Sequence, residues 1–120
     1  MASTVRVQVN ITASLAHAAG NKPYSPSASV SITPSGKYVV ESSITVPTSD
    51  TTLSKGSIGT VGLTFVQNLD DTNYIQVGDG TNWLIRLLPG EVFLGRWDTG
   101  TPHVKAHTSA CDIYYFMVEA

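Results

Sequence analysis

Hydrophobic and polar residues alternate from the start of the chain. Val5, Val7, Val9 and Ile11 occupy every second position, and polar residues stand between them. Successive side chains of a β-strand point to opposite faces, so this period of two predicts a strand. Within residues 1–13 this strand is either an extended arm, open to pairing with another chain, or the first strand of the chain's own sheet.

The same alternation recurs along the rest of the chain. Clusters of Gly, Pro, Asn and Asp separate the alternating segments and predict the turns between them. The expected strands cover residues 28–33, 38–46, 61–67, 74–77, 83–88, 92–97, 104–106 and 112–118. About nine short strands at roughly ten-residue spacing are typical of a β-sandwich or a barrel. The strand from Trp83 to Leu88 is apolar on both faces apart from Arg86, which predicts a central position in its sheet and places Trp83 in the core.

The composition agrees with an all-β fold. Valine, isoleucine and threonine contribute 13, 7 and 14 residues, 34 of 120 in all, whereas glutamate contributes 3. Side chains branched at Cβ fit pleated sheets better than helices. A chain of 120 residues has the size of one ordinary domain. We therefore expect a single antiparallel, jelly-roll-like β-sandwich of about eight or nine short strands that spans residues 1–120.

Charge and cysteine content narrow the partners and the compartment. The formal net charge is −2 and only 13% of the residues are charged, which gives no electrostatic reason to expect nucleic acid. No apolar run is long enough for a membrane span, and the start of the chain lacks the pattern of a cleaved secretion signal, so neither is expected. Cys111 stands alone, which excludes an intramolecular disulfide and predicts a buried small hydrophobic residue.

Ionisable residues give little indication of catalysis. His103 and His107 are four residues apart, about 13 Å along a strand at roughly 3.3 Å per residue, which is too far for one metal ion. We interpret them as surface histidines that flank a short strand, with a small metal-dependent enzyme as the least favoured hypothesis. The spacing of Asp70, Asp71 and Asp79 does not fit a calcium loop, and aspartates in turns usually bind their own backbone. We therefore predict no enzyme, no metal site and no cofactor.

Aromatic and valine residues are the remaining candidates for contacts with other molecules. Trp97 lies at a predicted strand end beside a polar turn, and tryptophan is enriched at binding hot spots. Alternation places Tyr114 and Tyr115 on opposite faces of one strand. The predicted protein-interaction residues are Trp97, Tyr24, Tyr114, Val5, Val7 and Val9.

Four segments in a fixed order carry a family resemblance. They are Gly56–Thr60, the Asn-Leu-Asp turn and Tyr-x-x-Val-Gly strand of Asn68–Gly78, the Leu-Leu-Pro-Gly-Glu turn of Leu87–Glu91, and Val104–Ala106. Together they resemble small all-β virion structural proteins of tailed bacteriophages, over roughly residues 51–119. The resemblance implies a role in the particle, such as capsid decoration, head fibre, or head or tail accessory component. It implies no catalytic residues, and it makes Asn68–Gly78 and Leu87–Glu91 scaffold positions.

Two functional hypotheses follow. The first is a viral structural protein that is made in the host cytoplasm and located in the virion. Its partners are other copies of itself, as a homotrimer by family analogy, and a major capsid or other virion protein. The second is a carbohydrate-binding module on a β-sandwich, indicated by Trp97, Tyr24 and the turn from Asp79 to Asn82.

Overall fold

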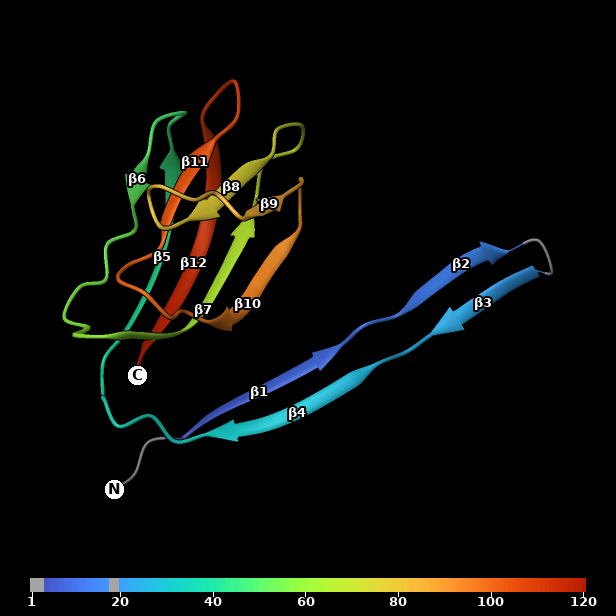
Figure 1. Ribbon diagram of the computed structural model, residues 1–120, viewed down its shortest axis with the longest axis horizontal. Coiled ribbons are helices and arrows are strands. Elements are labelled where there is room, and N and C mark those ends of the chain that lie inside the picture. Colours follow the sequence, from blue (N-terminus) through green and yellow to red (C-terminus); the bar gives the residue numbers. More distant parts are fainter. Residues whose placement is uncertain (1–3, 18–19) are drawn as a thin grey trace. The chain divides into compact units, whose positions relative to one another are not determined.

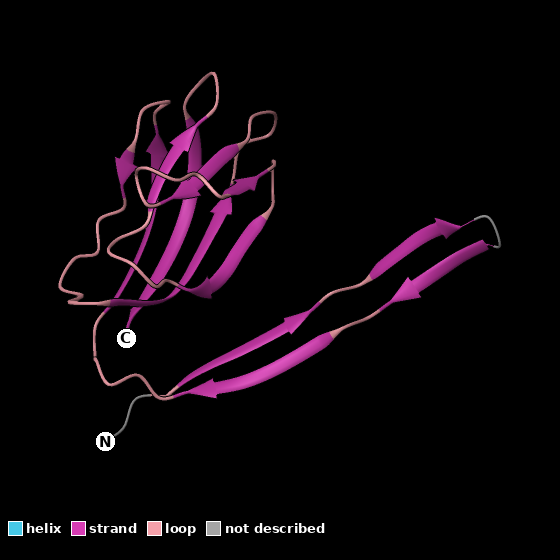
Figure 2. Ribbon diagram, in the orientation of Figure 1, coloured by secondary structure: helices cyan, strands magenta, loops and turns pink. Residues whose placement is uncertain are grey.

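The computed structural model describes residues 4–17 and 20–120, and the side chains of residues 13–24 lie outside the described part. The described residues form twelve β-strands and no helix (Figure 2), and every strand pairing is antiparallel. Among them there is accordingly no helix of the length and apolarity that crossing a membrane requires. The chain divides into two compact units, Met1–Pro34 and Ser35–Ala120.

The first unit is a long β-hairpin. Its strands are β1 (Val5–Asn10), β2 (Ala13–His17), β3 (Gly20–Tyr24) and β4 (Ser27–Ile32). β1 pairs with β4 and β2 pairs with β3, and the partner numbers add up to 37 throughout, from Val5 with Ile32 to His17 with Gly20. Between the two pairings, the Ile11 N–H donates to the Pro26 carbonyl. The four strands therefore form one two-stranded ribbon without a register shift (Figure 1).

The second unit is a β-sandwich, which confirms the expected all-β sandwich fold. One sheet has the order β10-β7-β12-β5 and the other has the order β6-β11-β8-β9 (Figure 1). The strands of the first sheet are β5 (Val39–Val46), β7 (Val61–Asn68), β10 (Val92–Arg96) and β12 (Cys111–Glu119). Those of the second sheet are β6 (Thr51–Thr52), β8 (Ile75–Gly78), β9 (Ile85–Leu87) and β11 (His103–Ala106).

The sandwich begins later in the chain than the sequence pattern indicates. The pattern predicts one sandwich over residues 1–120, whereas β1 and β4 pair with each other and the two sheets draw their strands from Ser35–Ala120. An alternating segment predicts a strand and its faces, but it does not specify which other strand pairs with it. Residues 5–10 form β1, which pairs with β4 in the hairpin.

The core lies between the two sheets. Alternate residues of each strand enter it, among them Val46, Val66, Ile75, Val77, Val104, Ile113, Tyr115 and Met117. Tyr115 is buried and its hydroxyl donates to the Ser54 carbonyl at 2.9 Å, whereas Tyr114 lies on the outer face, which confirms that the two tyrosines face opposite ways. Cys111 is also confirmed as a buried residue, and burial raises the pKa of its thiol.

The predicted strand over residues 83–88 differs most from the structure. β9 lies at an edge of its sheet, not at its centre, and Leu84 is 87% exposed. Trp83 is not in the core cluster; its ring lies 4.5 Å from the Lys105 ammonium, which belongs to the outward-facing set of β11. The apolar run was misleading because the chain turns back after β8, so its residues flank an edge strand and do not pass through the middle of the sheet.

The carboxylate of Glu119 joins three segments of the sandwich. It accepts hydrogen bonds from the backbone N–H of Gly59 at 2.6 Å and of Lys37 at 3.0 Å. These bonds favour the charged form and hold the pKa of Glu119 below its ordinary value of 4.5. The last strand is thereby connected to the residues that precede β5 and β7.

Acidification is expected to destabilise the sandwich through this carboxylate. Because the folded-state pKa is lowered, the stabilisation is complete above the pKa of the unfolded chain and is lost as the pH falls through the folded value. When thermal unfolding is followed from about pH 7 to pH 3, the midpoint temperature should decrease once the pH is below about 4.5. Glu119→Gln should make this dependence shallower, and an identical pH dependence in both proteins would contradict the assignment.

Candidate functional site

The hairpin has one apolar face and one polar face. Val5, Val7 and Val9 stand directly opposite Ile32, Val30 and Ala28, so all six side chains lie on one side of the ribbon. We call these six residues the hairpin strip. The opposite side carries Arg6, Gln8, Asn10, Ser27, Ser29 and Ser31. Val30 is 53% exposed, and so is Ile11, which continues the alternation beyond the strip.

The hairpin strip has the properties of a binding surface. A two-stranded ribbon is a single layer without a second layer to form a core, and isolated hairpins are at best marginally stable in water. Full burial of one such side chain stabilises by about 1.5–3 kcal/mol. The structure thus brings the predicted contact residues Val5, Val7 and Val9 together on one face. Tyr24 takes the register position opposite Ala13, and its side chain lies outside the described part.

A second apolar surface lies on the outer face of the β10-β7-β12-β5 sheet. Leu94, Phe65 and Phe116 stand side by side across β10, β7 and β12. We call the outward-facing apolar residues of these strands the sheet patch: Leu63, Phe65, Val92, Leu94, Tyr114 and Phe116. Val92 is 50% and Leu94 37% exposed. An exposed apolar surface of several neighbouring residues is typical of a contact site.

Tyr114 supplies the polar group of the sheet patch. Its ring meets Phe65 edge-on, with centroids 5.8 Å apart, and its hydroxyl donates to the Glu41 carboxylate at 2.7 Å. This hydrogen bond to a carboxylate raises the pKa of Tyr114. The predicted contact residue Tyr114 therefore lies at the outer surface of the sandwich, beside an acidic group.

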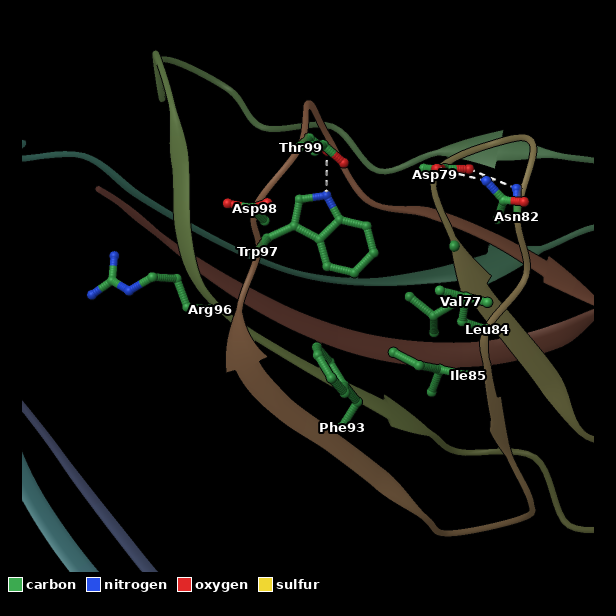
Figure 3. A pocket seen from close by; sticks show the side chains of 11 residues that line it. Val77, Asp79, Asn82, Leu84, Ile85, Phe93, Arg96, Trp97, Asp98 and Thr99 are labelled. Atoms are coloured by element: carbon green, nitrogen blue, oxygen red, sulfur yellow. Dashed lines mark hydrogen bonds between the residues drawn. The ribbon is translucent and has the colours of Figure 1, made fainter.

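A pocket of about 240 Å³ opens beside Trp97. The indole N–H donates to the Thr99 carbonyl at 2.7 Å, and the Phe93 ring meets the indole at 88° with centroids 6.3 Å apart. Figure 3 shows Phe93 and Ile85 on one side of the indole and the turn of Asp79 and Asn82 on another, whereas Arg96 points away. Trp97 is half-buried against the core, so its ring is rigidly placed at the pocket wall.

The turn at the pocket rim is preorganised by Asp79. Its carboxylate accepts the backbone N–H of Thr81 at 2.8 Å and of Asn82 at 2.6 Å, which lowers the pKa of Asp79. Trp97 and the Asp79–Asn82 turn, selected separately from the sequence, thus line the same pocket. The sequence did not indicate that Leu84 and Phe93 line this pocket, because apolar residues in strands are ordinarily core residues.

The two described histidines do not converge on a common site. Nδ1 of His103 lies 2.7 Å from the Asp50 carboxylate, at the start of β11. The His107 ring stacks on the Tyr74 ring, with the two centroids 4.2 Å apart. The guanidinium of Arg86 also lies 4.2 Å from the centroid of the Tyr74 ring. Among the residues whose side chains are described, 4–12 and 25–120, no three His, Cys, Asp or Glu are grouped as metal ligands would be.

Two of the four segments that carry the family resemblance, Asn68–Gly78 and Leu87–Glu91, are joined by one buried side chain. Asn68 is fully buried, and its amide donates to the Asn73 carbonyl at 2.9 Å and to the Leu87 carbonyl at 3.0 Å. Its side-chain oxygen accepts the Asp70 N–H at 2.9 Å. Gly90, in the Leu87–Glu91 turn, has a φ of 82°, a value that glycine adopts without strain. Asn68 therefore holds the Asn68–Asn73 turn against the end of β9.

Comparison with known proteins identifies no relative. No family model matches the chain, and neither a curated protein nor a solved structure resembles it significantly. Three surfaces of the molecule are therefore the candidates for function: the hairpin strip, the sheet patch and the Trp97 pocket.

Proposed function

We propose that the protein is a non-enzymatic structural component of a tailed-bacteriophage particle, either a capsid decoration or cement protein or a head or tail accessory. The observation that carries this proposal is the hairpin, a two-stranded ribbon that forms a unit of its own and carries the six apolar side chains of the hairpin strip on one face. Such an extension is suited to contact with a neighbouring subunit, because unpaired strand edges and an open apolar face can both accept another chain.

The strand order supports this proposal. Numbered within the sandwich, the first, eighth, third and sixth strands form one sheet, and the second, seventh, fourth and fifth form the other. We take this order to fit a jelly roll, an architecture that occurs in viral capsid and lectin domains. A fold by itself does not determine function, so the order supports the proposal only together with the hairpin.

The partners in this proposal are other copies of the chain and a major capsid or other virion protein. Particle subunits make repeated, symmetric contacts, so individually weak contacts gain strength from their number. A homotrimer on the virion surface is the assembly that the family resemblance favours. The hairpin strip and the sheet patch are the surfaces on which such contacts would form.

Mass spectrometry of purified virions tests this proposal. In particles of the phage whose genome encodes the chain, we expect the protein in many copies and in a fixed ratio to the major capsid protein. A lysate of infected cells serves as the control for expression. Presence in the lysate together with absence from the particle would end the proposal.

The Trp97 pocket favours a second candidate function, a carbohydrate-binding module. It combines an aromatic wall with the carboxylate and amide of the Asp79–Asn82 turn, a mixture of apolar and oriented polar groups that suits a sugar. Tyr24, the third feature of the sequence hypothesis, belongs to the hairpin unit, and its side chain lies outside the described part.

A glycan array with two tryptophan variants tests this candidate. Trp97→Ala removes the pocket wall, whereas Trp83→Ala changes a tryptophan outside the pocket. If the pocket binds a sugar, Trp97→Ala should weaken binding at least about tenfold, because truncation of a hot-spot aromatic residue costs roughly 2 kcal/mol. Trp83→Ala should leave binding unchanged. No binding of the wild type, or equal loss in both variants, would reject the pocket as a sugar site.

A further inference from the structure

The hairpin strip and the sheet patch are two apolar surfaces on two different units of the same chain. The strip consists of aliphatic side chains on a narrow ribbon, and the patch is a broader sheet face that combines aliphatic and aromatic side chains. Ribbon and sheet are both pleated surfaces, so side chains of one can interdigitate with those of the other as they do between the layers of a sandwich. Each surface is therefore a sterically suitable cover for the other.

The charges of the two units favour contact between the strip and the patch. Met1–Pro34 contains two Lys or Arg residues and no Asp or Glu, which gives a net charge of +2. Ser35–Ala120 contains five Lys or Arg and nine Asp or Glu, which gives −4. The outer face at the patch carries Glu41, opposite Phe116, and Asp112 on β12, together with Arg96, opposite Leu63, so its net charge is −1. A hairpin would be attracted to this sheet and repelled by a second hairpin.

The connection between the units favours contact with another copy. β4 ends at Ile32, and Ser35 and Gly36 are already held by the carbonyl oxygen of Ala120, at 3.2 and 2.9 Å. Only Thr33 and Pro34 lie between the end of β4 and these held residues of the sandwich. Proline has a fixed φ and keeps the preceding residue extended, so this connection is short and stiff. Short connections of this kind favour exchange of an element between copies over its return to the same copy.

We propose that the hairpin strip of one copy packs on the sheet patch of a second copy, so that the copies exchange hairpins. This inference rests on the self-association in the proposed function and specifies its two surfaces. The contact joins two different surfaces, so its repetition generates a closed ring, such as a trimer, where the rotation closes. The strip and the patch are both covered in such a ring.

Paired charge substitutions in the full-length chain test this contact by light scattering. Val7→Asp with Val30→Asp disrupts the strip at one cross-strand pair, and Leu94→Asp disrupts the patch. Gln8→Asp with Ser29→Asp is the matched control, because it places the same two charges on the neighbouring pair of the opposite face. We expect complete loss of the wild-type assembly in the strip and patch variants, each of which should have the 12.8 kDa mass of one chain. The control should keep the wild-type mass.

Mixing the two defective proteins distinguishes hairpin exchange from other contacts. The patch variant retains an intact strip and the strip variant an intact patch, so an equimolar mixture should form a species of twice 12.8 kDa. This result does not depend on whether the altered hairpin stays folded. If the mixture remains monomeric, or if Leu94→Asp leaves the wild-type mass unchanged, the inference is wrong. The proposed function fails separately, by absence of the chain from virions.

Isotope labelling separates exchange between copies from contact within one copy. Wild-type chains with and without 15N are mixed, allowed to re-equilibrate and treated with a carbodiimide, which joins lysine to carboxylate. Linked peptides that join Lys22 of one isotope to an acidic peptide of the other support the proposal. Links from Lys22 that are confined to chains of the same isotope would overturn it.

Discussion

Replacing Asn68 with alanine is expected to destabilise the sandwich by about 3–4 kcal/mol. The side chain is fully buried and makes three hydrogen bonds, two to the carbonyls of Asn73 and Leu87 and one from the Asp70 N–H. Alanine lacks the side-chain amide and loses all three bonds at once. The two carbonyls and the N–H that it bonded are then left without a hydrogen-bond partner inside the protein. The loss should separate the two turns that the family resemblance singles out.

Chemical denaturation of Asn68→Ala and Asn82→Ala provides the measurement. Asn82 is an exposed asparagine whose side-chain amide makes one long bond of 3.3 Å to Asp79, so its replacement should cost no more than about 0.5 kcal/mol. A loss for Asn68→Ala that is as small as the control value would show that the buried amide does not hold the turns together.

Gly78→Ala is expected to destabilise the sandwich by about 3 kcal/mol and to distort the Trp97 pocket. A Cβ atom at Gly78 would collide with the carbonyl oxygen of Asn82 and would lie 3.0 Å from the Cα of Trp83. Both neighbours are backbone atoms, so the turn itself would have to move. Because Asp79 and Asn82 line the pocket, the same displacement would change the pocket rim.

Gly100→Ala is the matched control for this substitution. Gly100 has a φ of 60°, and a Cβ there would meet no atom within 4 Å, so alanine adds backbone strain of about 1 kcal/mol without crowding. Denaturation midpoints and the fluorescence of Trp97 should both change more in Gly78→Ala. Equal losses of stability in the two variants would show that the turn after β8 can move to make room for a side chain at Gly78.

The sequence predicted the longer strands of the sandwich well because each has one buried and one exposed face, whereas the two-residue strand β6 is too short to show alternation. The alternation within the predicted strand 112–118 correctly placed Tyr114 and Tyr115 on opposite faces. The alternation did not predict burial correctly where the burial of a strand depends on which strands lie beside it in the sheet. The apolar segment after Gly80 suggested a central strand, but β9 is an edge strand, and an edge position depends on pairings that no local pattern encodes.

The candidate surfaces were only partly predictable for the same reason. Val5, Val7 and Val9 could be selected from their spacing, but their position on one face of a two-stranded ribbon follows from the pairing of β1 with β4. The sheet patch was represented by Tyr114 alone, because outward-facing Phe65 and Leu94 look like core residues in a sequence. Trp97 and the Asp79–Asn82 turn could be chosen individually, whereas their meeting in one pocket depends on contact between the two sheets.

Self-association of the unmodified chain is the most direct measurement of the whole account. If two exposed apolar surfaces exist to bind identical copies, light scattering across a dilution series should give an integral multiple of 12.8 kDa, with three copies favoured. A mass of 12.8 kDa at every concentration would mean that neither surface recognises another copy, and it would contradict the account at its centre.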